Sequence, residues 1–218
     1  MKKLSLILFI SALGANAALI NFDSPPSGLV PNSSFIQGSA VDTAAQVTTQ
    51  FENLGVVLGT VGGAPYAVLI DLGTGHAVSG TNGIGPATAA GNLDYTLDLD
   101  IFLVVPGTLN AAVTDNISIR GDEIPSGGEV DFTAYDVNGV LIASGSAADT
   151  AGGTYALNAS GIHEFRLHSQ HGDVAYDDLS FDTPVAPTQD GAPEPSTFAL
   201  LGGGFALAGL LGRRGSRT

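Results

Sequence analysis

Three aspartates, Asp94, Asp98 and Asp100, alternate with apolar residues in the stretch 93–101 and have spacings that could suit a hydrolytic pair. Paired carboxylates hydrolyse glycosidic bonds when one is an acid and the other a nucleophile or base. The acid needs a raised pKa in an enclosed, usually aromatic-lined cleft, and the chain has no tryptophan and five tyrosines. The pattern therefore favours the solvated face of an amphipathic strand over a catalytic pair.

The histidines His163, His168 and His171, with Asp173 nearby, form the only histidine cluster in the sequence. On a strand over 162–168, His163 and His168 would point to opposite faces and would not easily share a metal. His168, His171 and Asp173 could still meet across a turn. We expect exposed turn histidines and no transition-metal site.

Other catalytic motifs are missing from the sequence. Gly-x-Ser-x-Gly does not occur, and the glycine-containing stretch 83–86 lacks the strand-to-helix context of a nucleotide loop. The chain has no cysteine, so disulfides, thiolate nucleophiles and Cys-ligated metals are excluded. We predict no catalytic residues, no cofactor beyond a structural cation, and a protein that is not an enzyme.

Between Ala18 and Ala192 the only basic residues are Arg120 and Arg166, against 20 acidic ones, a net charge of −18. Binding to a nucleic-acid backbone requires Lys and Arg to displace counterions, so nucleic acid is excluded as a partner. The charge suits a solvated surface, divalent cations or neutral sugars.

The 30 glycines and 11 prolines disfavour long helices and favour short strands joined by turns. Period-2 alternation is clearest over 93–101, and Asn138-Gly139 predicts a hairpin between 130–135 and 140–143. With no amphipathic helix to cover a sheet, two sheets must cover each other. We predict an all-β fold, an antiparallel β-sandwich or jelly roll. The remaining strands are expected at 19–22, 56–61, 66–71, 116–120, 154–157, 162–168 and 174–181.

The N-terminus has the three parts of a secretory signal peptide. Met1-Lys2-Lys3 is the positive region, 4–13 the apolar region, and Ala15-Asn16-Ala17 a small-x-small cleavage site. The sequence predicts a signal peptide over residues 1–17 that is removed by signal peptidase.

The C-terminus is also tripartite. Pro193, Glu194, Pro195 and Ser196 precede an uncharged apolar run over 197–212, which is followed by a basic cluster. This cluster comprises Arg213, Arg214 and Arg217. The order resembles the PEP-CTERM sorting signal, over residues 193–218. The resemblance implies cleavage near the motif by an exosortase, a membrane protease and transpeptidase, and transfer to a surface or matrix component.

The physical properties of this tail agree with a single transmembrane helix over 197–212. Sixteen residues make about 24 Å of helix, which can span a locally thinned bilayer. The three arginines favour a cytoplasmic C-terminus, which leaves the Pro-Glu-Pro motif on the outer face. The proline-rich, polar stretch 183–192 is predicted to be a linker, so the folded domain is expected over 18–182.

Both ends of the expected domain, 20–23 and 175–181, resemble the first and last strands of jelly-roll modules in exported bacterial proteins, many of which bind carbohydrate. In several of these, acidic residues near the termini share a structural calcium ion. The resemblance makes Asp23, Asp177 and Asp178 candidate calcium ligands, and carboxylate oxygens suit this cation. The alternative is an exposed turn with solvated aspartates.

The sequence thus predicts an exported, non-enzymatic protein of the cell envelope, cell surface or extracellular matrix, such as a biofilm matrix. It would be membrane-anchored through its C-terminal helix before processing. One alternative is a carbohydrate-binding module with polysaccharide as its partner and tyrosines as stacking platforms. These would be Tyr66, Tyr95, Tyr135 or Tyr155. A less favoured alternative is a secreted hydrolase.

Overall fold

The computed structural model describes residues 17–59, 66–123, 127–172 and 174–188. The chain divides into two compact units, Met1–Ala186 and Pro187–Thr218, and the fold described below is that of the first. The predicted apolar region of the signal peptide, the sorting motif and the helix over 197–212 lie outside the described residues. Within those residues no helix is long and apolar enough to cross a membrane.

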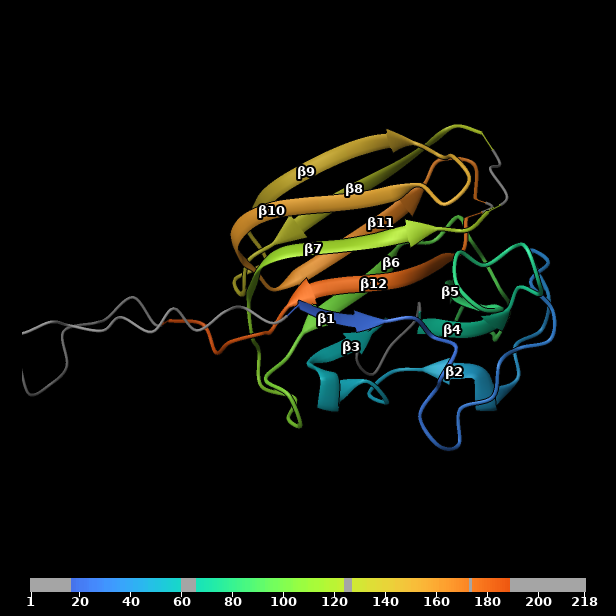
Figure 1. Ribbon diagram of the computed structural model, residues 1–218, viewed down its shortest axis with the longest axis horizontal. Helices are drawn as coiled ribbons and strands as arrows, with labels where there is room; N and C mark the ends of the chain where they lie inside the picture. The colour runs from blue at the N-terminus through green and yellow to red at the C-terminus, as the bar shows by residue number, and fades with distance from the viewer. Residues whose placement is uncertain (1–16, 60–65, 124–126, 173, 189–218) are drawn as a thin grey trace, which may run out of the picture. The chain divides into compact units, whose positions relative to one another are not determined.

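Strands dominate the described part of the chain, with two short 3-10 helices in the first third (Figure 1). In order they are β1 (Ala17–Ile20), η1 (Thr43–Ala45), β2 (Gln46–Val47), η2 (Glu52–Leu54), β3 (Val56–Leu58), β4 (Tyr66–Asp71), β5 (Asn82–Ala87), β6 (Leu99–Leu103), β7 (Thr114–Gly121), β8 (Glu129–Tyr135), β9 (Leu141–Ala148), β10 (Thr154–Ile162), β11 (Glu164–Ser169) and β12 (Tyr176–Asp182).

The strands form two sheets, and every pairing between named strands is antiparallel. The large sheet has the order β10-β7-β12-β5-β4-β2, and the small sheet has the order β3-β6-β11-β8-β9. β1 also pairs with β12, with Ala17 opposite Asp182. The predicted antiparallel β-sandwich is confirmed.

The core lies between the inner faces of the two sheets. Alternate residues of β7, β8 and β11 are buried there, as the period-2 pattern requires. The ring of Phe132 lies 6.0 Å from that of Tyr155, which joins the two sheets, and 6.4 Å from that of Phe165 in its own sheet. Burial of each such side chain contributes roughly 2 kcal/mol.

The hairpin predicted at Asn138-Gly139 is confirmed between β8 and β9. Asp136 Oδ1 accepts hydrogen bonds from the backbone N–H groups of Asn138 and Val140, and Gly139 has φ 74°. A positive φ of this size is the conformation that makes glycine favourable in such turns.

The strand predicted over 93–101 is wrong in its first half, because β6 begins only at Leu99. Asp94 Oδ1 accepts hydrogen bonds from the N–H and the hydroxyl of Thr96. Such a side-chain turn competes with strand pairing. Asp94 and Asp98 therefore lie outside β6, and of the three aspartates Asp100 alone belongs to the strand.

Strand β5 was not predicted, because its sequence contains two glycines and a proline. It is nevertheless buried throughout and lies between β4 and β12. A Cβ on Gly85 would lie 2.7 Å from the ring of Tyr95. The close approach of this ring explains why a residue without a side chain occupies the position.

Candidate functional site

The three predicted calcium ligands converge in space, although Asp23 is more than 150 positions from the other two. Their carboxylates meet at the hydroxyl of Ser79, whose Oγ lies 3.3 Å from Asp23, 3.1 Å from Asp177 and 2.9 Å from Asp178. We call Asp23, Ser79, Asp177 and Asp178 the acidic cluster. The pairing of β1 with β12 brings Asp23 to this place.

The backbone of β12 turns two consecutive aspartates towards one point. The register between β12 and β7 shifts between Asp177 and Ser180, and Asp178 has φ 48°. Neighbouring residues of a regular strand point to opposite faces, and a bulge removes that constraint. Gly80, with φ 52°, passes so close that a Cβ would lie 2.1 Å from the Asp23 carboxylate.

Hydrogen-bond donors of the protein satisfy part of the negative charge in the acidic cluster. Backbone N–H groups of Thr81 and Asn82 donate to Asp23, and those of Ser79 and Asp178 donate to Asp177. The Ser79 hydroxyl has a single proton and can donate it to only one of its three carboxylate neighbours. The cation nearest to Asp178 is Arg120, with Nη1 at 3.6 Å from Oδ2.

Within the described residues, no group of three or more His, Asp or Glu side chains is arranged to hold a metal ion. The acidic cluster is centred on a hydroxyl instead. Calcium binding by Asp23, Asp177 and Asp178 therefore stays a prediction. Ser79 and Arg120 were missed by sequence reasoning, because neither lies in a motif that marks it as a partner of these aspartates.

Acidification should stabilise the fold through Asp177. Burial raises the pKa of its carboxyl from 3.8 to about 6, against the opposing hydrogen bonds from Ser79 and Asp178. The folded state then binds a proton more tightly than the unfolded chain, so stability rises as the pH falls from 7 to 5. We expect a gain of about 1 kcal/mol from this group, or about 2–4 °C in Tm.

Thermal melts of the wild type and of Asp177→Asn at pH 7 and pH 5 in chelator isolate this effect, because general charge repulsion changes equally in both. An equal pH response of the two proteins would contradict it.

The same melts with calcium at pH 7 check the calcium prediction. Bound cation raises Tm by mass action, and Asp23→Asn should abolish that rise.

A second group of charged side chains, centred on Arg166, lies on the outer face of the small sheet. Arg166 Nε lies 2.7 Å from Asp100 Oδ1, and Nη2 lies 2.6 Å from Glu164 Oε1. The guanidinium carbon lies 5.2 Å from the centre of the Tyr135 ring. We call Asp100, Tyr135, Glu164 and Arg166 the arginine network.

The solvated face predicted for the aspartates near residue 100 is wrong for Asp100, whose residue is only 8% exposed. It lies directly across from Arg166 in the pairing of β6 with β11. Burial raises the pKa of Glu164, and the charge of Arg166 opposes that rise. The network thus pairs the carboxylates of Asp100 and Glu164 with one guanidinium.

The histidines have local partners. His163 Nδ1 lies 2.9 Å from the carbonyl oxygen of Ala112, and His168 Nδ1 lies 2.9 Å from Asp98 Oδ1. His163 immediately precedes β11, so it is not part of the strand as predicted. Asp173, the possible partner of His168 and His171, lies outside the described residues.

Two of the four tyrosines suggested as sugar-stacking platforms are buried. Tyr95 and Tyr155 are 5% and 0% exposed, so neither can stack on a ligand. Tyr66 and Tyr135 are half-buried, and Arg166 lies over the ring of Tyr135. Of the four, Tyr66 and Tyr135 are therefore the ones with an exposed part, and a sugar would have to stack on the face of Tyr135 that Arg166 does not cover.

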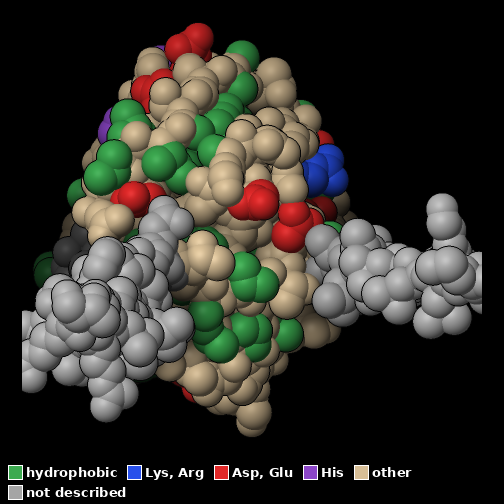
Figure 2. Space-filling view, turned by 90° about the vertical axis from the view of Figure 1, so that its left-hand side faces the viewer, with side chains coloured by type: hydrophobic (Ala, Val, Ile, Leu, Met, Phe, Trp, Pro, Cys, Tyr) green, Lys and Arg blue, Asp and Glu red, His purple; other side chains and the backbone are tan. Residues whose placement is uncertain are grey.

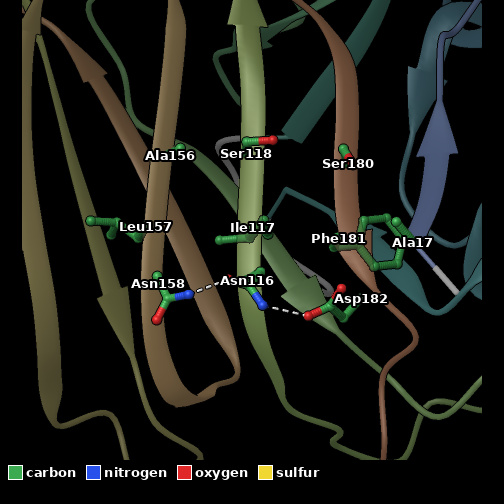
Figure 3. A pocket seen from close by; sticks show the side chains of 10 residues that line it. All are labelled: Ala17, Asn116, Ile117, Ser118, Ala156, Leu157, Asn158, Ser180, Phe181 and Asp182. Carbon is green, nitrogen blue, oxygen red and sulfur yellow. Dashed lines mark hydrogen bonds between the residues drawn. The ribbon is translucent and has the colours of Figure 1, made fainter. Parts of the chain in front are cut away.

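The outer face of the large sheet carries a shallow hollow of about 330 Å³ where β1, β7, β10 and β12 lie side by side (Figure 3). Asn158 donates a hydrogen bond to Asn116, and Asn116 donates one to Asp182. Ser118 and Ser180 line the same hollow. Its lining offers amides, hydroxyls and the carboxylate of Asp182.

Fold and sequence together define an all-β sandwich with an acidic body, followed by an apolar, basic-ended tail. Residues 192–217 match the family model of the PEP-CTERM protein-sorting motif. The prediction of a PEP-CTERM tail is thereby confirmed. The chain is an exported, cell-envelope-associated protein that an exosortase sorts.

Among curated proteins, none matches the chain. Solved structures with some likeness include a DUF4465 family protein from Bacteroides caccae, with 10% identity and a TM-score of 0.40. That likeness covers 79% of this chain and 100% of the other. Another is the enzymatically active domain of tailspike protein 4 from bacteriophage CBA120, with 12% identity and a TM-score of 0.32. It covers 70% of this chain and 22% of the other. Neither likeness bears on function.

Proposed function

We propose that the chain is a non-enzymatic component of the cell surface or extracellular matrix. Its apolar segment over 197–212 holds it in the membrane until an exosortase cleaves near Pro193-Glu194-Pro195. The main support for this proposal is that one chain contains both this sorting tail and a strongly acidic sandwich. A high net charge keeps such a body solvated at the surface.

The contacts of the charged side chains support a structural role. Asp98 and Asp100, two of the carboxylates considered for hydrolysis, contact His168 and Arg166. Asp94 binds Thr96 and Gln37 in a turn. These side chains stabilise the sandwich itself, and a hydrolytic role is not favoured.

Carbohydrate binding is the second candidate function, favoured by the half-buried ring of Tyr135 on the outer face of the small sheet. A glycan array probed with residues 18–186, which belong to one compact unit, separates the two. The structural proposal predicts no binding above background. Binding that is lost in Tyr135→Ala and kept in Tyr66→Ala would favour the carbohydrate function instead.

A further inference from the structure

Most of the exposed apolar side chains lie at one end of the sandwich. Of the ten large hydrophobic residues that are exposed in the described part of the chain, six belong to this end. They are Leu54, Leu109, Val137, Val140, Leu141 and Val185. We call this the exit end, because the chain leaves the sandwich here after β12. Figure 2 faces it and shows hydrophobic side chains in an upper and a lower group, with acidic side chains between them.

Hydrogen bonds hold the segments of the exit end together. Val185 exchanges two backbone hydrogen bonds with Val113. The backbone N–H of His163 donates to Tyr135 at the base of the β8–β9 turn, and its ring contacts Ala112. Leu109 lines an apolar hollow of about 160 Å³ beside them. Backbone hydrogen bonds therefore hold together the segments that bear these side chains.

Both hydrophobic targeting segments are attached to this end. Ala17, the last residue of the predicted signal peptide, pairs with Asp182, the last residue of β12. Ten residues, 187–196, separate the sandwich from the apolar run of the tail, and they can span at most about 36 Å. While the tail is in the bilayer, Ala186 at the exit end can therefore be no more than about 36 Å from the start of the apolar run.

The charges at this end indicate which lipids it suits. The segments 52–57, 104–116, 136–141, 158–164 and 182–186 contain Glu52, Asp115, Asp136, Glu164 and Asp182 but no Lys or Arg. The Arg166 guanidinium, which lies over Tyr135, is paired with Asp100 and Glu164. Anionic headgroups would be repelled, whereas apolar side chains can enter the interface of a neutral bilayer.

We propose that the exit end is a membrane-binding surface for neutral lipid. Its apolar side chains enter the headgroup region and hold the sandwich with its chain exit towards the bilayer, so that Pro193-Glu194-Pro195 stays at the surface. This inference rests on the proposed function, because it requires the tail to be in the membrane before processing.

Single-tryptophan probes in the full chain test whether the exit end enters the lipid, since the native chain has no tryptophan. Leu109→Trp places a probe at the exit end, and Ile36→Trp, at a 68% exposed residue in the loop between β1 and η1, is the matched control. This loop lies at the opposite end of the sandwich (Figure 1). In phosphatidylcholine vesicles with brominated acyl chains, we expect at least about twofold stronger quenching of the first probe than of the second. Val140→Trp, at a second exposed position of the exit end, should behave like Leu109→Trp.

Each outcome decides the matter. Equal, weak quenching of all three probes in protein that floats with the vesicles would refute lipid binding by the exit end, although the tail would still be in the membrane. It would favour a protein partner for this surface instead. Failure of the full chain to float would overturn the tail anchor and lipid binding by the exit end together. Addition of phosphatidylglycerol should weaken the quenching at Leu109→Trp, and a stronger signal would contradict the preference for neutral lipid.

Discussion

Deletion of residues 193–218 should move the protein from the cell envelope into the surrounding medium. The deletion removes the sorting motif, the apolar run and Arg213, Arg214 and Arg217, while every described strand remains. Export by the predicted N-terminal signal peptide would continue, but the acidic sandwich would lack the proposed membrane segment over 197–212 that retains it. Immunoblots of envelope and culture supernatant measure the shift, which should include most of the protein.

A matched control keeps the tail and removes only part of the linker, residues 187–192. That variant should remain in the envelope, because its motif and apolar run are unchanged. If the protein without residues 193–218 stayed in the envelope as firmly as the wild type, sorting by the tail would be refuted.

Replacement of Arg166 by methionine should destabilise the sandwich by about 2 kcal/mol, or about 4–8 °C in Tm. The side chains of Asp100 and Glu164 are only 10% and 14% exposed and would lose their shared cation. Partial exposure of Arg166 itself keeps the loss below that of a fully buried pair. Thermal melts at pH 7 measure the difference.

The loss in Arg166→Met should be smaller at pH 5 than at pH 7. Without the guanidinium, the pKa that burial already raises at Glu164 rises further, so the folded variant gains a proton and stability as the pH falls. The matched control is Arg120→Met, the other arginine of the sandwich. Arg120 is half-exposed, its ion pair with Asp178 is 3.6 Å long, and its Nε and Nη2 donate to the Gly152 carbonyl oxygen. Its replacement should cost less than about 1 kcal/mol. Equal costs for the two variants would contradict the role given to the arginine network.

Alternation and turn chemistry were sufficient to predict the sandwich and several of its strands. The strand over 66–71 and the β8–β9 hairpin follow from local sequence, because a short apolar run that is buried on both faces and a glycine turn are each encoded within a few residues. Asp94 was placed in a strand because its neighbours alternate, yet its side chain forms a turn. Strand β5 was missed because the ring of Tyr95, which explains Gly85, comes from a different part of the chain.

The candidate site was predictable only in part, and for a similar reason. The resemblance of the two domain ends to jelly-roll modules predicted that Asp23, Asp177 and Asp178 lie together. In the structure, the pairing of β1 with β12 brings them close. Ser79 belongs to a loop almost 100 positions from Asp177, and Arg166 meets Asp100 only through the register of β6 with β11. Contacts between residues so far apart in the chain depend on strand order and register, which cannot be read from local patterns in one sequence.

Mass spectrometry of both termini of the protein recovered from the cell envelope tests the proposed export and sorting. We expect an N-terminus at Ala18 and a C-terminus near Pro193-Glu194-Pro195 in cells that have an exosortase. In cells that lack the exosortase we expect the same N-terminus with the tail retained to Thr218. An intact tail on the surface protein of exosortase-containing cells, or an unprocessed Met1 in the cytoplasm, would contradict this proposal.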